Sequence, residues 1–108
     1  MSYPAAQIVT VYATFPSEEE ARRIGRQLVE ERLAACINIL GPCHSIYRWQ
    51  GAIEEAAEIP ALLKTSRPGP LIERLAELHS YEVPAAVVWP IAVANPPFAE
   101  WIAEETAR

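Results

Sequence analysis

The hydrophobic and polar positions near the N-terminus change from the period of a strand to that of a helix. From Ile8 to Phe15, residues of the two classes alternate, which predicts a strand. Pro16 ends this run, and Ser17 with Glu20 three residues later has the spacing of a capping box. Apolar residues then recur at helical spacing and predict a helix from Glu18 to about Arg32.

The middle of the chain has the pattern of one long hairpin. Its first arm consists of the β-rich runs 36–40 and 45–49, which Gly41-Pro42 separates by a bend. Gln50-Gly51 offers a tight turn into a second arm, Ala52–Thr65. Pro60 has no N–H for the ladder, so we expect it at a sheet edge or a bulge.

The last forty residues predict a helix, a strand and a final helix. Pro68-Gly69-Pro70 ends the hairpin, and leucines at 71, 75 and 78 follow at helical spacing. The apolar, β-branched run 83–93 predicts a strand, which Pro90 interrupts. Asn95 then caps a C-terminal helix, with Pro96 at its first position. Of this helix we expect three side chains to face inward: Phe98, Trp101 and Ile102.

The order of these elements indicates an α+β fold over a single domain, residues 1–108. We expect a ferredoxin-like βαββαβ sandwich with a long central hairpin and an extra C-terminal helix.

Composition narrows the class of protein. The chain has 108 residues, of which 51% are hydrophobic, and a formal net charge of −5. These values argue against disorder and against nucleic-acid binding. No stretch approaches the ~20 apolar residues of a membrane span, and the segment Met1–Gln7 lacks the pattern of a signal peptide. We therefore expect a cytoplasmic protein whose two cysteines, Cys36 and Cys43, stay as thiols.

The seven residues Leu78–Pro84, at a helix-to-strand junction, gather the most chemistry. They include His79, Tyr81 and Glu82. His79 could be a metal ligand, could act with Glu82 as acid and base, or could simply complement the helix dipole. Catalysis would need a substrate pocket that the sequence does not show, and the chain has no Asp, no Gly-rich phosphate loop and no nucleophile elbow. We predict that the protein is not an enzyme.

The cysteines and large aromatic residues carry two further expectations. Cys43 and His44 are adjacent on a strand, so they should point to opposite faces and not share an ion, and Cys36 should be a core residue. The long hairpin and the three tryptophans indicate a homo-oligomer, with Trp49 at the interface and Trp101 in its own subunit's core.

Several separated runs, in order along nearly the whole chain, carry a family resemblance. They are Thr14-Phe15-Pro16-Ser17-Glu18-Glu19, Arg32-Leu33-Ala34-Ala35-Cys36-Ile37-Asn38, Ile46-Tyr47-Arg48-Trp49-Gln50-Gly51 with Ile53-Glu54-Glu55, Leu78–Pro84, and an ending with Pro90-Ile91, Asn95-Pro96 and Glu100-Trp101-Ile102. The chain closely resembles the CutA divalent-cation-tolerance proteins.

This resemblance implies a compact homotrimer, similar in architecture to PII signalling proteins, that responds to divalent metals and above all to copper. Family copper ligands carried over by position fall on Ala13, Leu78 and His79, of which only His79 has a donor atom. The resemblance thus implies weak Cu²⁺ binding at His79. The alternative is a small-molecule sensor or protein-binding regulator that uses clefts between subunits, lined by Trp49, Lys64, Tyr81 and Glu82, where Lys64 and Glu82 could pair with each other.

Overall fold

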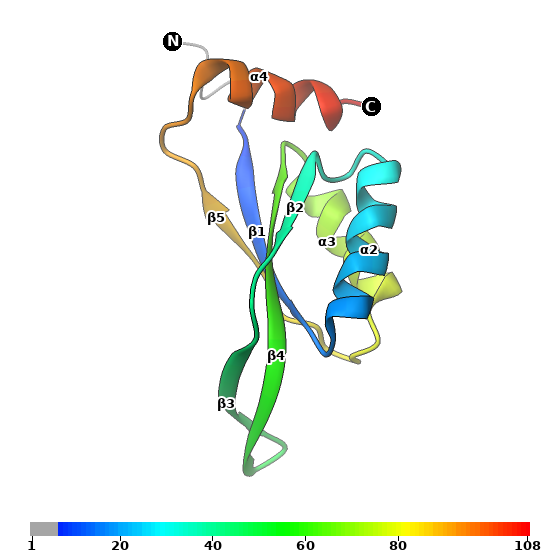
Figure 1. The fold of residues 1–108 in the computed structure, drawn as a ribbon, viewed down its shortest axis with the longest axis vertical. Coiled ribbons are helices and arrows are strands. Elements are labelled where there is room, and N and C mark those ends of the chain that lie inside the picture. The colour runs from blue at the N-terminus through cyan, green and yellow to red at the C-terminus, as the bar shows by residue number, and fades with distance from the viewer. Residues whose placement is uncertain (1–6) are drawn as a thin grey trace.

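The computed structural model, which describes residues 7–108, contains an antiparallel sheet with helices on one face and at one end (Figure 1). The expectation about a signal peptide concerns Met1–Gln7, and residues 1–6 lie outside the described residues. In chain order the elements are β1 (Val9–Phe15), α2 (Glu18–Glu30), β2 (Cys36–Ile39), β3 (Cys43–Trp49), β4 (Ala52–Thr65), α3 (Pro68–Leu78), β5 (Ala86–Pro90) and α4 (Pro96–Glu105). The mixed α+β class and the predicted order of elements are confirmed.

Strand β4 organises the sheet. The strand order is β2-β4-β1-β5, and β3 pairs with the outer half of β4. Gln50 and Gly51 both have positive φ, 52° and 84°, which is the backbone of a type I′ turn and confirms the predicted hairpin. The hairpin extends well past the helices, at the bottom of Figure 1.

Pro60 lies at a bulge in the middle of this sheet, which confirms the expectation that it would be found at an edge or at a bulge. Ile39 pairs with Ala61, whereas Cys43 pairs with Glu58. Leu40 N donates to the Pro60 carbonyl at 2.9 Å, which leaves Gly41 and Pro42 opposite the single residue Ile59. In an antiparallel strand the N and O atoms of one residue point to the same side. The missing N–H of Pro60 therefore faces the hairpin's first arm, where the bulge lies, as its carbonyl does.

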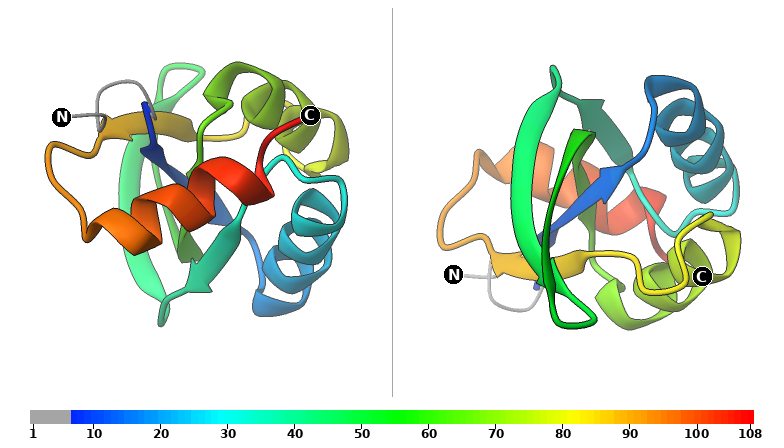
Figure 2. Two further views of the ribbon diagram at one scale, coloured as in Figure 1. Left: turned by 90° about the horizontal axis from the view of Figure 1, so that it is seen from above. Right: turned by 90° about the horizontal axis from the view of Figure 1, so that it is seen from below.

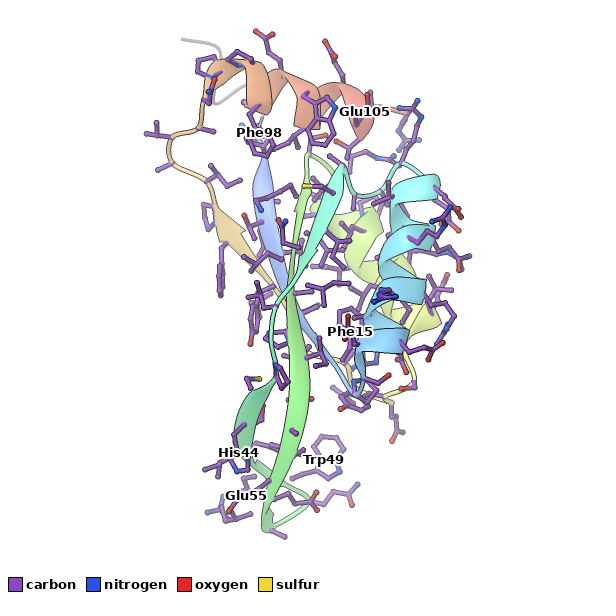
Figure 3. All side chains as sticks on the ribbon, in the orientation of Figure 1. Phe15, His44, Trp49, Glu55, Phe98 and Glu105 are labelled. Carbon is purple, nitrogen blue, oxygen red and sulfur yellow. The ribbon has the colours of Figure 1, made fainter. Side chains whose placement is uncertain are left out.

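The main core lies between the sheet and the layer of α2 and α3. Phe15, in the middle of Figure 3, is fully buried together with Ile24 and Leu28 of α2 and Leu71 and Leu75 of α3. Each helix thus buries an apolar stripe, as the spacing predicts. Arg74 of α3 donates two hydrogen bonds to Glu31, at 2.9 and 3.1 Å, and joins the two helices at their outer surface.

Helix α4 crosses the end of the sheet and closes a second, smaller core (Figure 2). Ile102 and Ala99 are buried there against Ile8 and Ala35. Thr106 Oγ1, just after the helix, accepts a hydrogen bond from Ser66 N at 3.1 Å and fastens α4 to the end of β4.

Several local expectations are corrected by the structure. Phe98 and Trp101 do not face inward: they are 42% and 38% exposed and stack on each other, so Trp101 is not a core residue of its own chain. The Asn95 side chain makes no cap hydrogen bond, because prolines occupy the first two helical positions and leave fewer N–H groups to satisfy. Cys36 is half-buried on the sheet face away from the helices and not in the core.

Gly25 marks the closest approach of α2 to the sheet. A Cβ at this position would lie 2.6 Å from Ile37 Cδ1 and 3.0 Å from Ile37 Cγ2. We expect Gly25→Val to lower the free energy of unfolding by about 1–3 kcal/mol through overpacking. Denaturant titration at one fixed protein concentration measures this. In an Ile37→Ala background the same change should cost clearly less, and an equal cost in both backgrounds would contradict the proposed contact.

Candidate functional site

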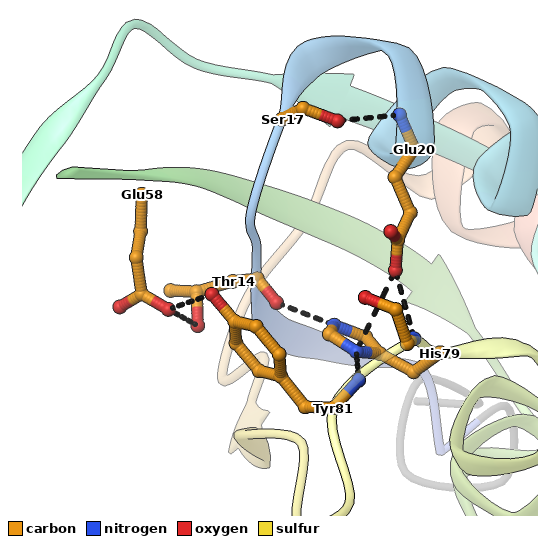
Figure 4. Close-up of polar contacts among 7 residues, drawn as sticks. Thr14, Ser17, Glu20, Glu58, His79 and Tyr81 are labelled. Carbon is orange, nitrogen blue, oxygen red and sulfur yellow. Dashed lines mark hydrogen bonds and ion pairs between the residues drawn. The ribbon is translucent and has the colours of Figure 1, made fainter. Parts of the chain in front are cut away.

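The junction after α3 is held by a buried imidazole. The His79 side chain has no exposed surface and lies against the Phe15 and Tyr81 rings, at centroid distances of 5.1 and 4.8 Å. Its Nε2 lies 2.8 Å from the Thr14 carbonyl oxygen, and its Nδ1 accepts a hydrogen bond from Tyr81 N at 3.0 Å (Figure 4). A carbonyl can only accept, so the ring is the neutral tautomer with its proton on Nε2.

Glu20 completes this arrangement from the first turn of α2. Its Oε2 accepts a hydrogen bond from Ser80 N at 2.9 Å and lies 3.7 Å from His79 Nδ1. Ser17 Oγ accepts from Glu20 N at 3.1 Å, so the predicted N-cap is present. The capping box itself is not formed, because the Glu20 carboxylate is used to hold the 78–84 junction and not the start of its own helix.

These contacts disfavour His79 as a metal ligand. Both ring nitrogens are hydrogen-bonded, and a cation could reach either of them only after one of those bonds breaks. The other two positions that the resemblance implies for copper have no donor atom, since Ala13 is fully buried in the core and Leu78 packs against that core. Within residues 7–108 no group of three or more His, Cys, Asp or Glu side chains is placed to hold a metal ion. The residues present therefore do not fit a resident copper at this position.

No hydrogen bond or ion pair joins His79 to Glu82, so the acid–base pair considered from the sequence does not assemble in this structure. Glu82 is exposed, whereas His79 is buried. The other histidine, His44, is exposed, and its Nε2 lies 2.6 Å from Glu55 Oε1. Cys43 points to the opposite strand face and lies against Ser45, as the alternation predicts.

A cavity of about 700 Å³ opens beside the junction, between the hairpin and residues 80–85. Its walls contain four aromatic side chains: Tyr12, Tyr47, Trp49 and Tyr81. Three carboxylates also line it: Glu54, Glu58 and Glu82. Of the four residues expected at a cleft, the structure thus brings together Trp49, Tyr81 and Glu82.

Lys64 is the exception among the expected cleft residues. It does not line this cavity, and its Nζ donates to Asn38 Oδ1 at 3.4 Å, so it does not pair with Glu82. Sequence reasoning did not place Glu54, Glu58, Tyr12 or Tyr47 at a cleft. Tyr47 and Glu54 lie opposite each other in the hairpin, and the Gln50-Gly51 turn was sufficient to predict that pairing.

Glu58 is the best-connected acid of the cavity. Its Oε2 accepts a hydrogen bond from the Tyr81 hydroxyl at 3.0 Å and one from Thr14 Oγ1 at 3.4 Å (Figure 4). Partial burial, and then the hydrogen bond to the Glu58 carboxylate, raise the pKa of Tyr81 to about 12. Both act in the same direction, because each disfavours a phenolate at this position.

This raised pKa predicts a loss of stability at high pH. Below the unfolded pKa of about 10 the stabilising effect of the protonated phenol is fully present, and it is lost as the pH rises toward 12. Tyr81→Phe should flatten this decline in the free energy of unfolding between pH 9 and 12, relative to the parent protein. Glu58→Gln should lower the pKa of Tyr81 in an ultraviolet titration. An unchanged titration in Glu58→Gln would contradict the assigned hydrogen bond.

Comparison with known proteins gives consistent matches over nearly the whole chain. Residues 9–105 match the model of the family described as CutA1 divalent ion tolerance protein. The chain is 49% identical to the divalent-cation tolerance protein CutA of Thermus thermophilus, over 89% of this chain and 95% of that protein. It is 35% identical to human protein CutA over 96% of this chain, which spans 59% of the longer human protein.

Solved structures give the same result. The CutA crystal structure from Xylella fastidiosa superposes with a TM-score of 0.89 at 39% identity, and covers 94% of this chain and 99% of that one. The divalent cation tolerance protein from Thermus thermophilus superposes with a TM-score of 0.87 at 48% identity, and covers 93% and 99%.

Proposed function

Because the chain belongs to the CutA1 divalent ion tolerance family, we propose that it acts in divalent-cation tolerance as a non-catalytic homotrimer. The family match across residues 9–105 is the observation that carries this proposal. The strand order β2-β4-β1-β5, with two helices on one face, supports the ferredoxin-like type of fold. The described chain contains no helix that is both long and apolar enough to cross a membrane.

Exposed apolar side chains support the assembly. The sheet face away from the main helix layer carries Tyr12 stacked on Trp89, with ring centroids 5.0 Å apart, and Trp89 is 47% exposed. Phe98 and Trp101 of α4 are also exposed and stack on each other. A single chain with this much large apolar surface in water is expected to cover it with another copy.

Trp89→Glu tests this assembly. Placing a charge on the open sheet face should shift sedimentation from a mass near three subunits to that of one subunit, because a buried unpaired carboxylate is strongly unfavourable. Val29→Glu is the matched control, since Val29 is 37% exposed on α2, on the other side of the sheet, and should leave the mass unchanged. A parent protein that sediments as one subunit at every concentration would contradict the trimer.

We place the protein in the cytoplasm, where Cys36 and Cys43 would remain the free thiols that the structure shows. A relative from Archaeoglobus fulgidus is named a periplasmic divalent cation tolerance protein, and is 37% identical with a TM-score of 0.87. Recovery of this protein from an extracytoplasmic fraction would therefore overturn the placement.

Within one chain we propose that Cu²⁺ binds only weakly, through the exposed His44–Glu55 pair in place of the buried His79. His44 Nε2 and Glu55 Oε1 are hydrogen-bonded at 2.6 Å, but both side chains are more than half exposed, so copper from solvent can reach them and displace the shared proton. Figure 3 shows this pair near the tip of the hairpin, on the side away from Trp49. Because this pair offers only two ligands, we expect its affinity for Cu²⁺ to be low.

Calorimetric titration with Cu²⁺ distinguishes the two histidines. His44→Ala should remove most of the saturable heat, and His79→Ala, with its fold checked by circular dichroism, should retain it. Loss of the heat in His79→Ala alone would restore His79 as the ligand. No saturable heat from the parent protein would show that tolerance does not involve direct copper binding by this chain.

A further inference from the structure

The first residues after α3 form a hydrogen-bond arrangement that has a second possible state. Two consecutive backbone N–H groups donate to two neighbouring acceptors, Ser80 N to the Glu20 carboxylate at 2.9 Å and Tyr81 N to His79 Nδ1 at 3.0 Å (Figure 4). Glu20 Oε2 and His79 Nδ1 lie 3.7 Å apart, and the neutral tautomer has no proton between them. Because a nitrogen lone pair that faces a carboxylate is electrostatically unfavourable, a proton at this point would improve the contact.

A proton on His79 Nδ1 exchanges one hydrogen bond for another. Glu20 Oε2 has a second lone pair besides the one that Ser80 N uses, and a movement of about 1 Å brings it within hydrogen-bond distance of a protonated Nδ1. The same nitrogen can then no longer accept from Tyr81 N, because both nitrogens of an imidazolium are donors. Nε2 carries its proton in both forms, so the hydrogen bond to the Thr14 carbonyl is retained. The ring therefore stays in place, while the Tyr81 N–H loses its acceptor.

The surroundings of His79 contain what a charged ring requires. Full burial opposes the charge, since the side chain has no exposed surface. The Glu20 carboxylate, itself largely buried, offers the compensating negative charge at 3.7 Å. The Phe15 and Tyr81 rings lie against the imidazole at centroid distances of 5.1 and 4.8 Å, where aromatic faces attract a cation. A carboxylate and two aromatic rings thus act together against the effect of burial.

The titratable groups that face His79 all belong to the same chain. Glu20 comes from α2, Tyr81 from the loop of His79 itself, and Glu58 from β4, where its carboxylate accepts from the Tyr81 hydroxyl at 3.0 Å. Strand β1 and helix α3 contribute backbone carbonyls, which carry no charge. Because the imidazole is already buried within a single chain, these contacts do not depend on a second copy.

We propose that His79 and Glu20 form a proton-operated switch that determines whether the backbone of Tyr81 is anchored to the buried junction. With the ring neutral, Tyr81 is held at both ends, by its N–H on His79 and by its hydroxyl on Glu58. When His79 takes up one proton from solvent, Nδ1 donates to Glu20 and the Tyr81 N–H is released. Tyr81 is then joined to the hairpin alone, while Ser80 N remains bonded to Glu20. The proposal does not depend on metal binding or on the oligomeric state.

Two-dimensional NMR of the full chain labelled with nitrogen-15 tests the switch. As the pH is lowered from about 8 to about 5, the ring nitrogens of His79 should change from the Nε2–H tautomer to the imidazolium. The Tyr81 amide proton should lose its hydrogen-bonded chemical shift with the same midpoint, and Ser80 N–H should keep its protection from solvent exchange. Titration of His44 should leave the Tyr81 amide unchanged. A His79 ring that stays neutral until the whole protein unfolds would overturn the proposal, and so would a ring that titrates without a response at Tyr81 N.

Two adjacent glutamates of α2 provide matched variants. Glu20→Gln keeps a carbonyl acceptor for Ser80 N but removes the charge, so the transition at Tyr81 N should require a lower pH. Glu19→Gln removes the same charge from a side chain that is 82% exposed and should leave the midpoint unchanged. Equal shifts in both variants would reduce the effect to overall charge and refute the switch.

His79→Gln removes the titrating group itself. The Tyr81 amide should then show no transition between about pH 8 and about pH 5, because no proton can be taken up at this position. A transition that persists in this variant would assign the titration to another group and contradict the proposal. If His79→Gln does not fold, the titrations of the parent protein and of Glu20→Gln still decide the question.

Discussion

The bulge at Gly41 and Pro42, next to Pro60 in the sheet, is the constraint on which the rest of this molecule depends. Strand β4 pairs with β1 along one side and with both β2 and β3 along the other, and the register shifts by one residue between those two partners. In a strand, a shift of one residue moves every following side chain to the opposite face. Because of this shift, Tyr47 and Trp49 face the cavity, and without it Arg48 and His44 would occupy that face. The aromatic side chains that the hairpin's first arm contributes to the cavity are therefore set by one extra residue in that arm.

The second determinant is the way the chain fixes residues 78–84. Two consecutive backbone N–H groups donate hydrogen bonds here, Ser80 N to the Glu20 carboxylate and Tyr81 N to His79 Nδ1. His79 Nε2 in turn is hydrogen-bonded to the Thr14 carbonyl at the end of β1. Three segments distant in sequence thus meet at one buried imidazole. The buried His79 side chain accepts from Tyr81 N and lies against the Tyr81 ring, so its contacts position one wall of the cavity.

Much of the fold follows from local signals, and the site depends on long-range ones. Element order, the hairpin turn and the helix stripes were predictable because alternation, turn residues and helical spacing are properties of neighbouring residues. The pairing of Glu58 with Cys43 was not predictable, because it depends on the bulge. Glu20 was misassigned to a capping box, because its partner Ser80 lies sixty positions away. Phe98 and Trp101 fit the helical period of a buried stripe, but α4 needs only Ala99 and Ile102 to close the small core.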